Sequence, residues 1–168
     1  NADRMLAREE TMSAPLLDTE LDKVYPVING EGSDSAMLDN SLEFMMMAGM
    51  DLPLAVMVTI PEPWQGDKTI SRTKRDLYQY YAILMEPWDG PASILFSDGD
   101  VVGAVLDRNG LRPSRYYVTS DDRLILSSEV GVLDIPADRI VEKSRLQPGR
   151  MLLVDTRAGR IIGDEALK

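Results

Sequence analysis

The chain has 168 residues and a formal net charge of −10, and it contains neither cysteine nor histidine. These two absences exclude disulfides, thiolate zinc sites, cysteine-ligated iron–sulfur clusters, thiol nucleophiles, Ser-His-Asp triads and imidazole proton shuttles. Serine, threonine, lysine, tyrosine and carboxylate side chains remain for chemistry. A composition of 44% hydrophobic and 27% charged residues at this length is typical of one globular domain.

The negative charge is concentrated in the first 50 residues, which hold three basic and ten acidic side chains. Such a surface repels phosphate backbones and anionic lipids, so we expect neither nucleic acid nor a membrane surface as a partner. No apolar run approaches the roughly 20 residues that span a bilayer. The sequence therefore predicts a soluble protein. It lacks an initiator methionine and the apolar core of a signal peptide, and we expect it to be a fragment.

The first half of the chain predicts helices. Residues 1–32 are weakly patterned and indicate a surface arm or a helix with a loop. After residues 32–35, apolar side chains at spacings of three and four predict a capped amphipathic helix that ends at Gly49. A second short helix is predicted after Asp51, with Pro53 in its first turn and Pro61 at its end, although its apolar run also suits a buried strand.

A third helix is predicted after Ser71. It places Leu77, Tyr80, Tyr81 and Leu84 on one face, and Pro87 follows its end. We interpret its tyrosines, and the methionines at 45–47, as packing residues.

The second half of the chain switches to the period of strands. Residues 93–97 and 101–106 form a predicted hairpin, in which an Asp-Gly pair supplies the positive φ angles of the turn. Two further hairpins are predicted, at 115–119 with 123–127 and at 151–154 with 160–163. Helices followed by antiparallel strands indicate an α+β fold, and the absence of a linker predicts a single domain over 1–168.

Three short segments are candidates for a functional site. The isolated Gly-x-Gly at 30–32 lacks the strand and helix of a dinucleotide site, so we interpret it as a turn. The segment 107–113 is either a charged turn with an Asp107–arginine salt bridge or part of a site. Asp34 is either a simple helix cap or a receptor for an ammonium group, because a carboxylate there is an acceptor held in a fixed direction.

Several longer blocks carry a resemblance to a known family. They are Gly-Ser-Asp-Ser-Ala-Met-Leu-Asp-Asn at 32–40, Ile-Pro-Glu-Pro-Trp at 60–64, Met-Glu-Pro-Trp-Asp-Gly-Pro-Ala at 85–92, Gly-Ala-Val-Leu-Asp-Arg-Asn-Gly-Leu-Arg-Pro-Ser-Arg-Tyr at 103–116 and Ser-Glu-Val-Gly at 128–131. In this order they resemble the glutaminase domain of the glutamate synthase large subunit. Residues 109–113 and 128–129 are similar, more distantly, to elements of the class II glutamine amidotransferases.

The resemblance implies part of a four-layer αββα sandwich of the N-terminal-nucleophile type, in which glutamine is hydrolysed and its ammonia passes to a second site. It implies that an N-terminal cysteine is the nucleophile and that an Asn-Gly pair stabilises the oxyanion. This chain has no such cysteine. Asn29 and Gly30 imitate the pair, but by position they lie in the loop before residues 32–35, so we do not assign them that role.

The resemblance also implies one substrate contact in this chain. Asp34 matches the aspartate that binds the α-amino group of glutamine, whereas the segment 107–113 is carried over only as scaffold. We therefore expect an incomplete glutaminase domain over 1–168, without its N-terminal segment and inactive alone. The alternative is a non-catalytic amino-acid-binding or subunit-interaction module derived from this domain.

The expected surroundings follow from the same resemblance. No catalytic residue, metal site or cofactor is expected in this chain; FMN and an iron–sulfur cluster are expected in other domains of the parent enzyme. The expected partners are glutamine, other domains or subunits of glutamate synthase, and further copies of the fragment, because an incomplete sandwich leaves a sheet edge or an apolar face uncovered. The expected location is the cytoplasm, or the plastid for a plant-type enzyme.

Overall fold

The computed structural model describes residues 2–168, so that Asn1 lies outside the described residues. Helices α1 to α5 span Ala2–Arg8, Asp34–Met47, Leu52–Thr59, Arg72–Leu84 and Asp164–Leu167. Short 3-10 helices η1 to η3 span Glu9–Thr11, Asp18–Lys23 and Ala137–Arg139. Strands β1 to β7 span Ser93–Ser97, Val101–Leu106, Arg115–Thr119, Leu124–Ser127, Ile140–Arg145, Met151–Asp155 and Arg160–Ile162.

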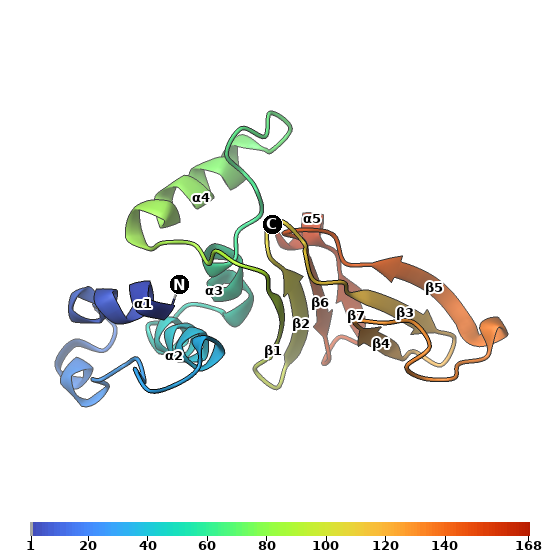
Figure 1. Ribbon diagram of the computed structural model, residues 1–168, viewed down its shortest axis with the longest axis horizontal. Helices are drawn as coiled ribbons and strands as arrows, with labels where there is room; N and C mark the ends of the chain where they lie inside the picture. The colour runs from blue at the N-terminus through green and yellow to red at the C-terminus, as the bar shows by residue number, and fades with distance from the viewer. Residues whose placement is uncertain (1) are drawn as a thin grey trace.

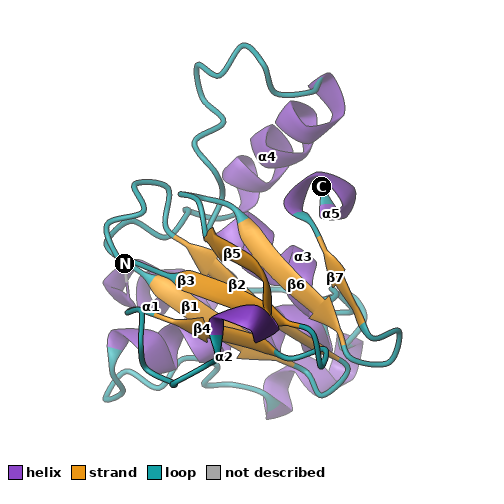
Figure 2. Cartoon of the chain, turned by 90° about the vertical axis from the view of Figure 1, so that its right-hand side faces the viewer, coloured by secondary structure: helices purple, strands orange, loops and turns teal. Residues whose placement is uncertain are grey.

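The elements form three layers. Helices α1 to α3 lie on one side of a four-stranded sheet of order β1-β2-β6-β7, and a three-stranded sheet of order β4-β3-β5 lies on the other side (Figure 1). Figure 2 looks down through the stack, with β3, β4 and β5 in front of the larger sheet. The strand pairs are antiparallel. The α+β prediction is confirmed, and the described residues supply three of the four layers that the resemblance implies.

Two apolar cores hold these layers together. Residues from α2, α3 and α4 pack against β1, β2 and β6, with Ala55 and Val56 of α3 fully buried in the middle. Between the two sheets, Ala104, Leu106 and Leu152 meet side chains of β3 and β4. Removing each buried aliphatic side chain from water stabilises the fold by about 1.5–3 kcal/mol. The sheets are therefore fixed relative to the helices by burial on both faces of the larger sheet.

The helices begin and end where the sequence predicts. The Ser33 hydroxyl accepts a hydrogen bond from the Ala36 N–H at the start of α2, and Gly49 beyond its end takes a φ of +91°. The second segment is helix α3 and not a strand. Asp51 precedes α3 as expected, but its side chain makes no capping hydrogen bond. The Ser71 hydroxyl caps α4 by accepting the Lys74 N–H.

One prediction about the face of a helix is wrong, and one strand was not predicted. Helix α4 turns Lys74 and Tyr78 toward the core, whereas Tyr80 and Leu84 are exposed. Strand β5 was not expected, because half of its residues Ile-Val-Glu-Lys-Ser-Arg are charged and they give no apolar alternation. It pairs with β3, so that β3 is the centre of its sheet. The three predicted hairpins are confirmed within one residue at each end.

No helix within residues 2–168 is long and apolar enough to cross a membrane.

Candidate functional site

A groove of about 870 Å³ lies between α2 and β1. One wall is a face of α2 and the other is β1 along its whole length. The lining residues are Ser35, Leu38, Asp39, Leu42, Glu43, Met46, Met47, Leu52 and residues 93–97. The groove is therefore apolar along most of its length, and its two charged lining residues are both carboxylates.

Asp34 lies at the first position of α2, directly before the groove residue Ser35. Its side chain is exposed and makes no hydrogen bond or ion pair with the described part of the chain. The cap of the helix is instead Ser33, whose hydroxyl also lies 3.1 Å from that of Ser35. The structure therefore does not support Asp34 as a simple helix cap. Its carboxylate is available to accept a hydrogen bond from a ligand.

The loop that leads into α2 is fixed by two side chains. The Ile28 N–H donates to the Glu9 carboxylate at 2.8 Å, and the Asn29 N–H donates to the Asn40 side-chain oxygen at 3.0 Å. The Asn29 carbonyl accepts the Gly32 N–H at 2.9 Å, which closes a turn. Asn29 and Gly30 therefore form the loop before α2, as the sequence position suggested.

Asp107 is a buried scaffold residue and makes no salt bridge with any of residues 2–168. Its two carboxylate oxygens accept the N–H groups of Ala92 and Asn109, each at 3.0 Å, and its carbonyl accepts the N–H groups of Gly110 and Gly149. The predicted Asp107–arginine pair is wrong, because a carboxylate that is 2% exposed satisfies its acceptors with backbone amides. The segment that follows β2 is thus held in place by Asp107.

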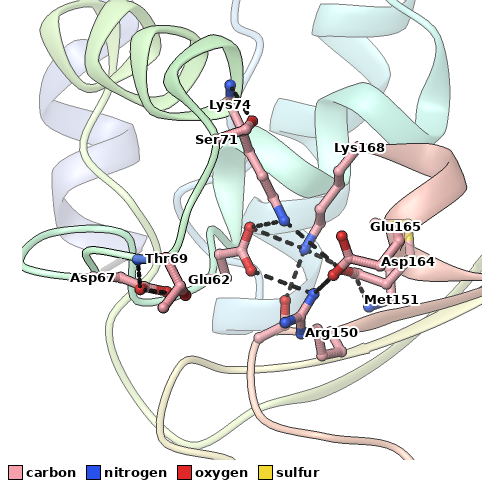
Figure 3. Close-up of polar contacts among 11 residues, drawn as sticks. Glu62, Asp67, Thr69, Ser71, Lys74, Arg150, Met151, Asp164, Glu165 and Lys168 are labelled. Carbon is pink, nitrogen blue, oxygen red and sulfur yellow. Dashed lines mark hydrogen bonds and ion pairs between the residues drawn. The ribbon is translucent and has the colours of Figure 1, made fainter.

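A buried network of charges lies at one end of the larger sheet (Figure 3). The Lys74 ammonium of α4 is 2.7 Å from the Glu62 carboxylate, and the Lys168 ammonium is 2.8 Å from the Asp164 carboxylate. The Arg150 guanidinium lies 2.6 Å from Asp164 and 3.8 Å from Glu62. The network joins the loop before α4, α4 itself, the turn before β6 and the C-terminal α5.

The pKa shifts in this network favour a structural role. Burial lowers the pKa of the Lys168 ammonium, and Asp164 beside it opposes that shift. Burial alone raises the pKa of Asp164, but hydrogen bonds from Lys168, the Met151 N–H and Arg150 hold it below its usual value. Burial and the nearby Glu62 carboxylate raise the pKa of Tyr78, so its phenol stays protonated. The charges neutralise one another and leave no free base.

The sequence did not predict this network. Glu62, Lys74 and Asp164 are separated by up to about a hundred positions, and each also suits an exposed surface. The spacing of Asp164 and Lys168 by four residues was the one local signal. Among residues 2–168 there is no group of three or more carboxylates that could hold a metal ion.

The comparisons with known proteins decide the family. The family model described as "Glutamine amidotransferases class-II" matches residues 1–168. The chain belongs to the class-II glutamine amidotransferases. The resemblance inferred from the sequence blocks is thereby confirmed at the level of the family.

Individual relatives of this amidotransferase chain are glutamate synthases. It is 50% identical over its whole length to the "Glutamate synthase [NADPH] large chain" of Bacillus subtilis and 53% identical to the "Glutamate synthase [NADH]" of Schizosaccharomyces pombe. It is 41% identical to the "Ferredoxin-dependent glutamate synthase, chloroplastic" of Oryza sativa subsp. japonica. The amidotransferase chain spans 8–11% of the length of these relatives.

Proposed function

We propose that this chain is the C-terminal portion of the glutaminase domain of a glutamate synthase, which hydrolyses glutamine to glutamate and ammonia for transfer to 2-oxoglutarate. The observation that carries the proposal is the family match over residues 1–168, together with the similarity to several proteins named as glutamate synthases. These relatives differ in the electron donor that their names give.

The proposed portion does not contain the nucleophile. The family reaction, as the resemblance implies it, needs a cysteine, and this chain has none. The buried lysines Lys74 and Lys168 offer no substitute because both are ion-paired, and Tyr78 offers none because its phenol stays protonated. We therefore propose that residues outside this sequence supply the nucleophile and that the 168-residue chain alone is inactive.

Asp34 is the residue that we propose to contact the substrate, by binding the α-amino group of glutamine. An ionised carboxylate only accepts hydrogen bonds, and an ammonium group only donates them. The Asp34 carboxylate is exposed at the start of α2, has no partner among the described residues and is next in sequence to the groove residue Ser35, which supports this role. A hydrogen bond between charged groups contributes about 1.5–3 kcal/mol, which separates glutamine from simple amides.

The test is the substitution Asp34→Ala in the full polypeptide encoded by the reading frame of this chain. We expect the KM for glutamine to rise about 10- to 100-fold, from the lost charged hydrogen bond, with kcat within about twofold of wild type. Glu31→Ala, which removes another exposed carboxylate three residues away, is the matched control and leaves KM unchanged. An unchanged KM in Asp34→Ala would remove Asp34 from the site.

The remaining groups of the reaction belong to other parts of the parent enzyme. An iron–sulfur cluster requires cysteine ligands, which this chain lacks, so we propose that the cluster and FMN are bound by other domains. Those domains or subunits are the proposed partners that receive the ammonia. We propose a cytoplasmic location, or a plastid location for a plant-type parent.

A further inference from the structure

Strand β1 is an edge strand with one side unpaired. It is hydrogen-bonded to β2 alone, at the end of the order β1-β2-β6-β7. Its sequence Ser-Ile-Leu-Phe-Ser carries no charge, no proline and no bulge. Natural edges are normally protected by such features, because an unpaired row of N–H and C=O groups pairs readily with another strand.

The register identifies which backbone groups are free. The Asp107 N–H donates to the Ala92 carbonyl, so residues 92 and 107 form a hydrogen-bonded pair just before β1. Hydrogen-bonded and non-hydrogen-bonded pairs alternate along an antiparallel ladder. Ile94 and Phe96 therefore bond to β2, whereas the N–H and C=O groups of Ser93, Leu95 and Ser97 point away from it.

The groove beside this edge is shaped for a strand. Helix α2 forms the opposite wall with Met46 and Met47, which are 37% and 39% exposed. Leu95, on the other face of β1, is 63% exposed. A strand placed one ladder spacing from β1, about 4.8 Å away, would lie in the groove and cover these apolar side chains.

The charges of the groove select between occupants. Asp39 and Glu43 line it one helical turn apart on α2, and neither has an ion-pair partner in residues 2–168. A second copy of the chain would bring the same two carboxylates and a net charge of −10. A strand with apolar side chains and a cationic group near Asp39 and Glu43 fits better. The relatives, in which this region is about a tenth of the chain, have ample polypeptide to supply it.

We propose that the outward edge of β1 is the docking site for an apolar, cation-bearing strand from the remainder of the same polypeptide, which extends the sheet beneath α2. The inference rests on the proposed function, in which this chain is part of a longer amidotransferase. It adds the place where the missing part joins. Such docking buries the groove and places the added strand beside Ser35, which follows Asp34 at the start of α2.

Hydrogen exchange tests the docking without relying on activity. We expect the outward amides of Ser93, Leu95 and Ser97 to exchange at least 100-fold more slowly in the full polypeptide than in the 168-residue chain, measured at a concentration where light scattering shows a monomer. Equal exchange in the two proteins would overturn the proposal. Protection of the three amides in the full polypeptide that is lost on dilution would assign the edge to a second copy and also overturn it.

Leu95→Pro separates backbone pairing from side-chain burial. Proline removes the outward N–H of Leu95, which β2 does not use, and an edge position tolerates it. In the full polypeptide we expect faster exchange at 93–97 and at least a 10-fold loss of glutaminase activity. Leu95→Ala keeps the N–H and is expected to stay within about threefold of wild type. Wild-type exchange and activity in Leu95→Pro would contradict the docking.

Two controls keep the outcomes distinct. In the 168-residue chain, the amides of β2 and β6 should remain protected in Leu95→Pro, which shows that the variant still folds. If they do not, the exchange of the β1 amides in the wild-type full polypeptide and in the wild-type 168-residue chain decides the proposal. A full polypeptide that protects β1 but releases no ammonia from glutamine would contradict the proposed function and leave the docking site intact. A full polypeptide that releases ammonia while the β1 amides stay unprotected would contradict the docking site and leave the proposed function intact.

Discussion

At the scale of single residues, the buried ion pairs at one end of the larger sheet show how position changes the role of a charge. Glu62 and Lys74 have side chains that are each 9% exposed, and their charged atoms are 2.7 Å apart. Taking both charges out of water costs several kcal/mol, which their attraction offsets only while both are present. Each residue of the pair therefore depends on the other.

Replacing one partner of this pair should be worse than replacing both. Lys74→Met leaves the Glu62 carboxylate buried with weaker partners, and we expect it to lower the free energy of unfolding by about 3–5 kcal/mol. The double variant Glu62→Gln with Lys74→Met should recover at least half of that loss. Urea denaturation of the wild type, Lys74→Met, Glu62→Gln and the double variant measures the coupling. Purely additive effects would contradict a direct pair.

Asp164 gives the network a defined dependence on pH. Its pKa is lower in the folded chain, so its contribution to stability is present above the unfolded pKa of about 3.9 and is lost as pH falls through the lower folded value. We expect Asp164→Asn to cost about 3 kcal/mol at pH 7 and the difference from wild type to shrink steadily below about pH 4. Unfolding measured from pH 7 to pH 2 tests this; a constant difference would count against it.

At the scale of elements, strand pairing depends on small residues that pattern analysis overlooks. Gly103 of β2 lies under the Phe96 ring of β1, and a Cβ at that position would come within 2.2 Å of the ring. The ring therefore packs across the neighbouring strand because Gly103 has no side chain. This contact joins β1 to β2 on the face that meets the helices.

Gly103→Ala should destabilise the β1–β2 pair. The ring would have to leave its site, and overpacking of this kind costs about 1–3 kcal/mol. Gly163→Ala, where a Cβ has nothing within 4 Å, is the matched control and should change stability by less than about 0.5 kcal/mol. Thermal unfolding compares the two. Equal effects would contradict the packing role of Gly103.

The sequence predicted the elements that local chemistry specifies. Caps at Ser33 and Ser71 and the Asp-Gly turn after β1 act within a few residues, so helices and hairpins were found at nearly their observed ends. Strand β5 and the packed face of α4 depend on distant partners: β5 is held by pairing with β3, and Lys74 is turned inward by Glu62. Asp34 was identified through the resemblance. The groove could not be predicted from the sequence, because it forms only where α2 packs beside the distant strand β1.

At the scale of the whole molecule, exposed apolar surface predicts self-association of the 168-residue chain. Ile83 of α4 is 75% exposed and Leu95 of β1 is 63% exposed, and the β1 edge is unpaired. We expect oligomers that grow with concentration in light scattering. Leu95→Lys, which adds a charge to the edge, should reduce them, and the full polypeptide should not form them through β1. A monomer at about 100 μM would contradict this expectation.

Ammonia release from glutamine is the decisive measurement of whether this chain is, as proposed, a glutaminase portion without its nucleophile. The 168-residue chain and the full polypeptide of the same reading frame are assayed side by side, with circular dichroism to show that both are folded. We expect ammonia from the full polypeptide and none above background from the 168-residue chain. Glutamine hydrolysis by the short chain at a rate comparable to that of the full polypeptide would contradict it.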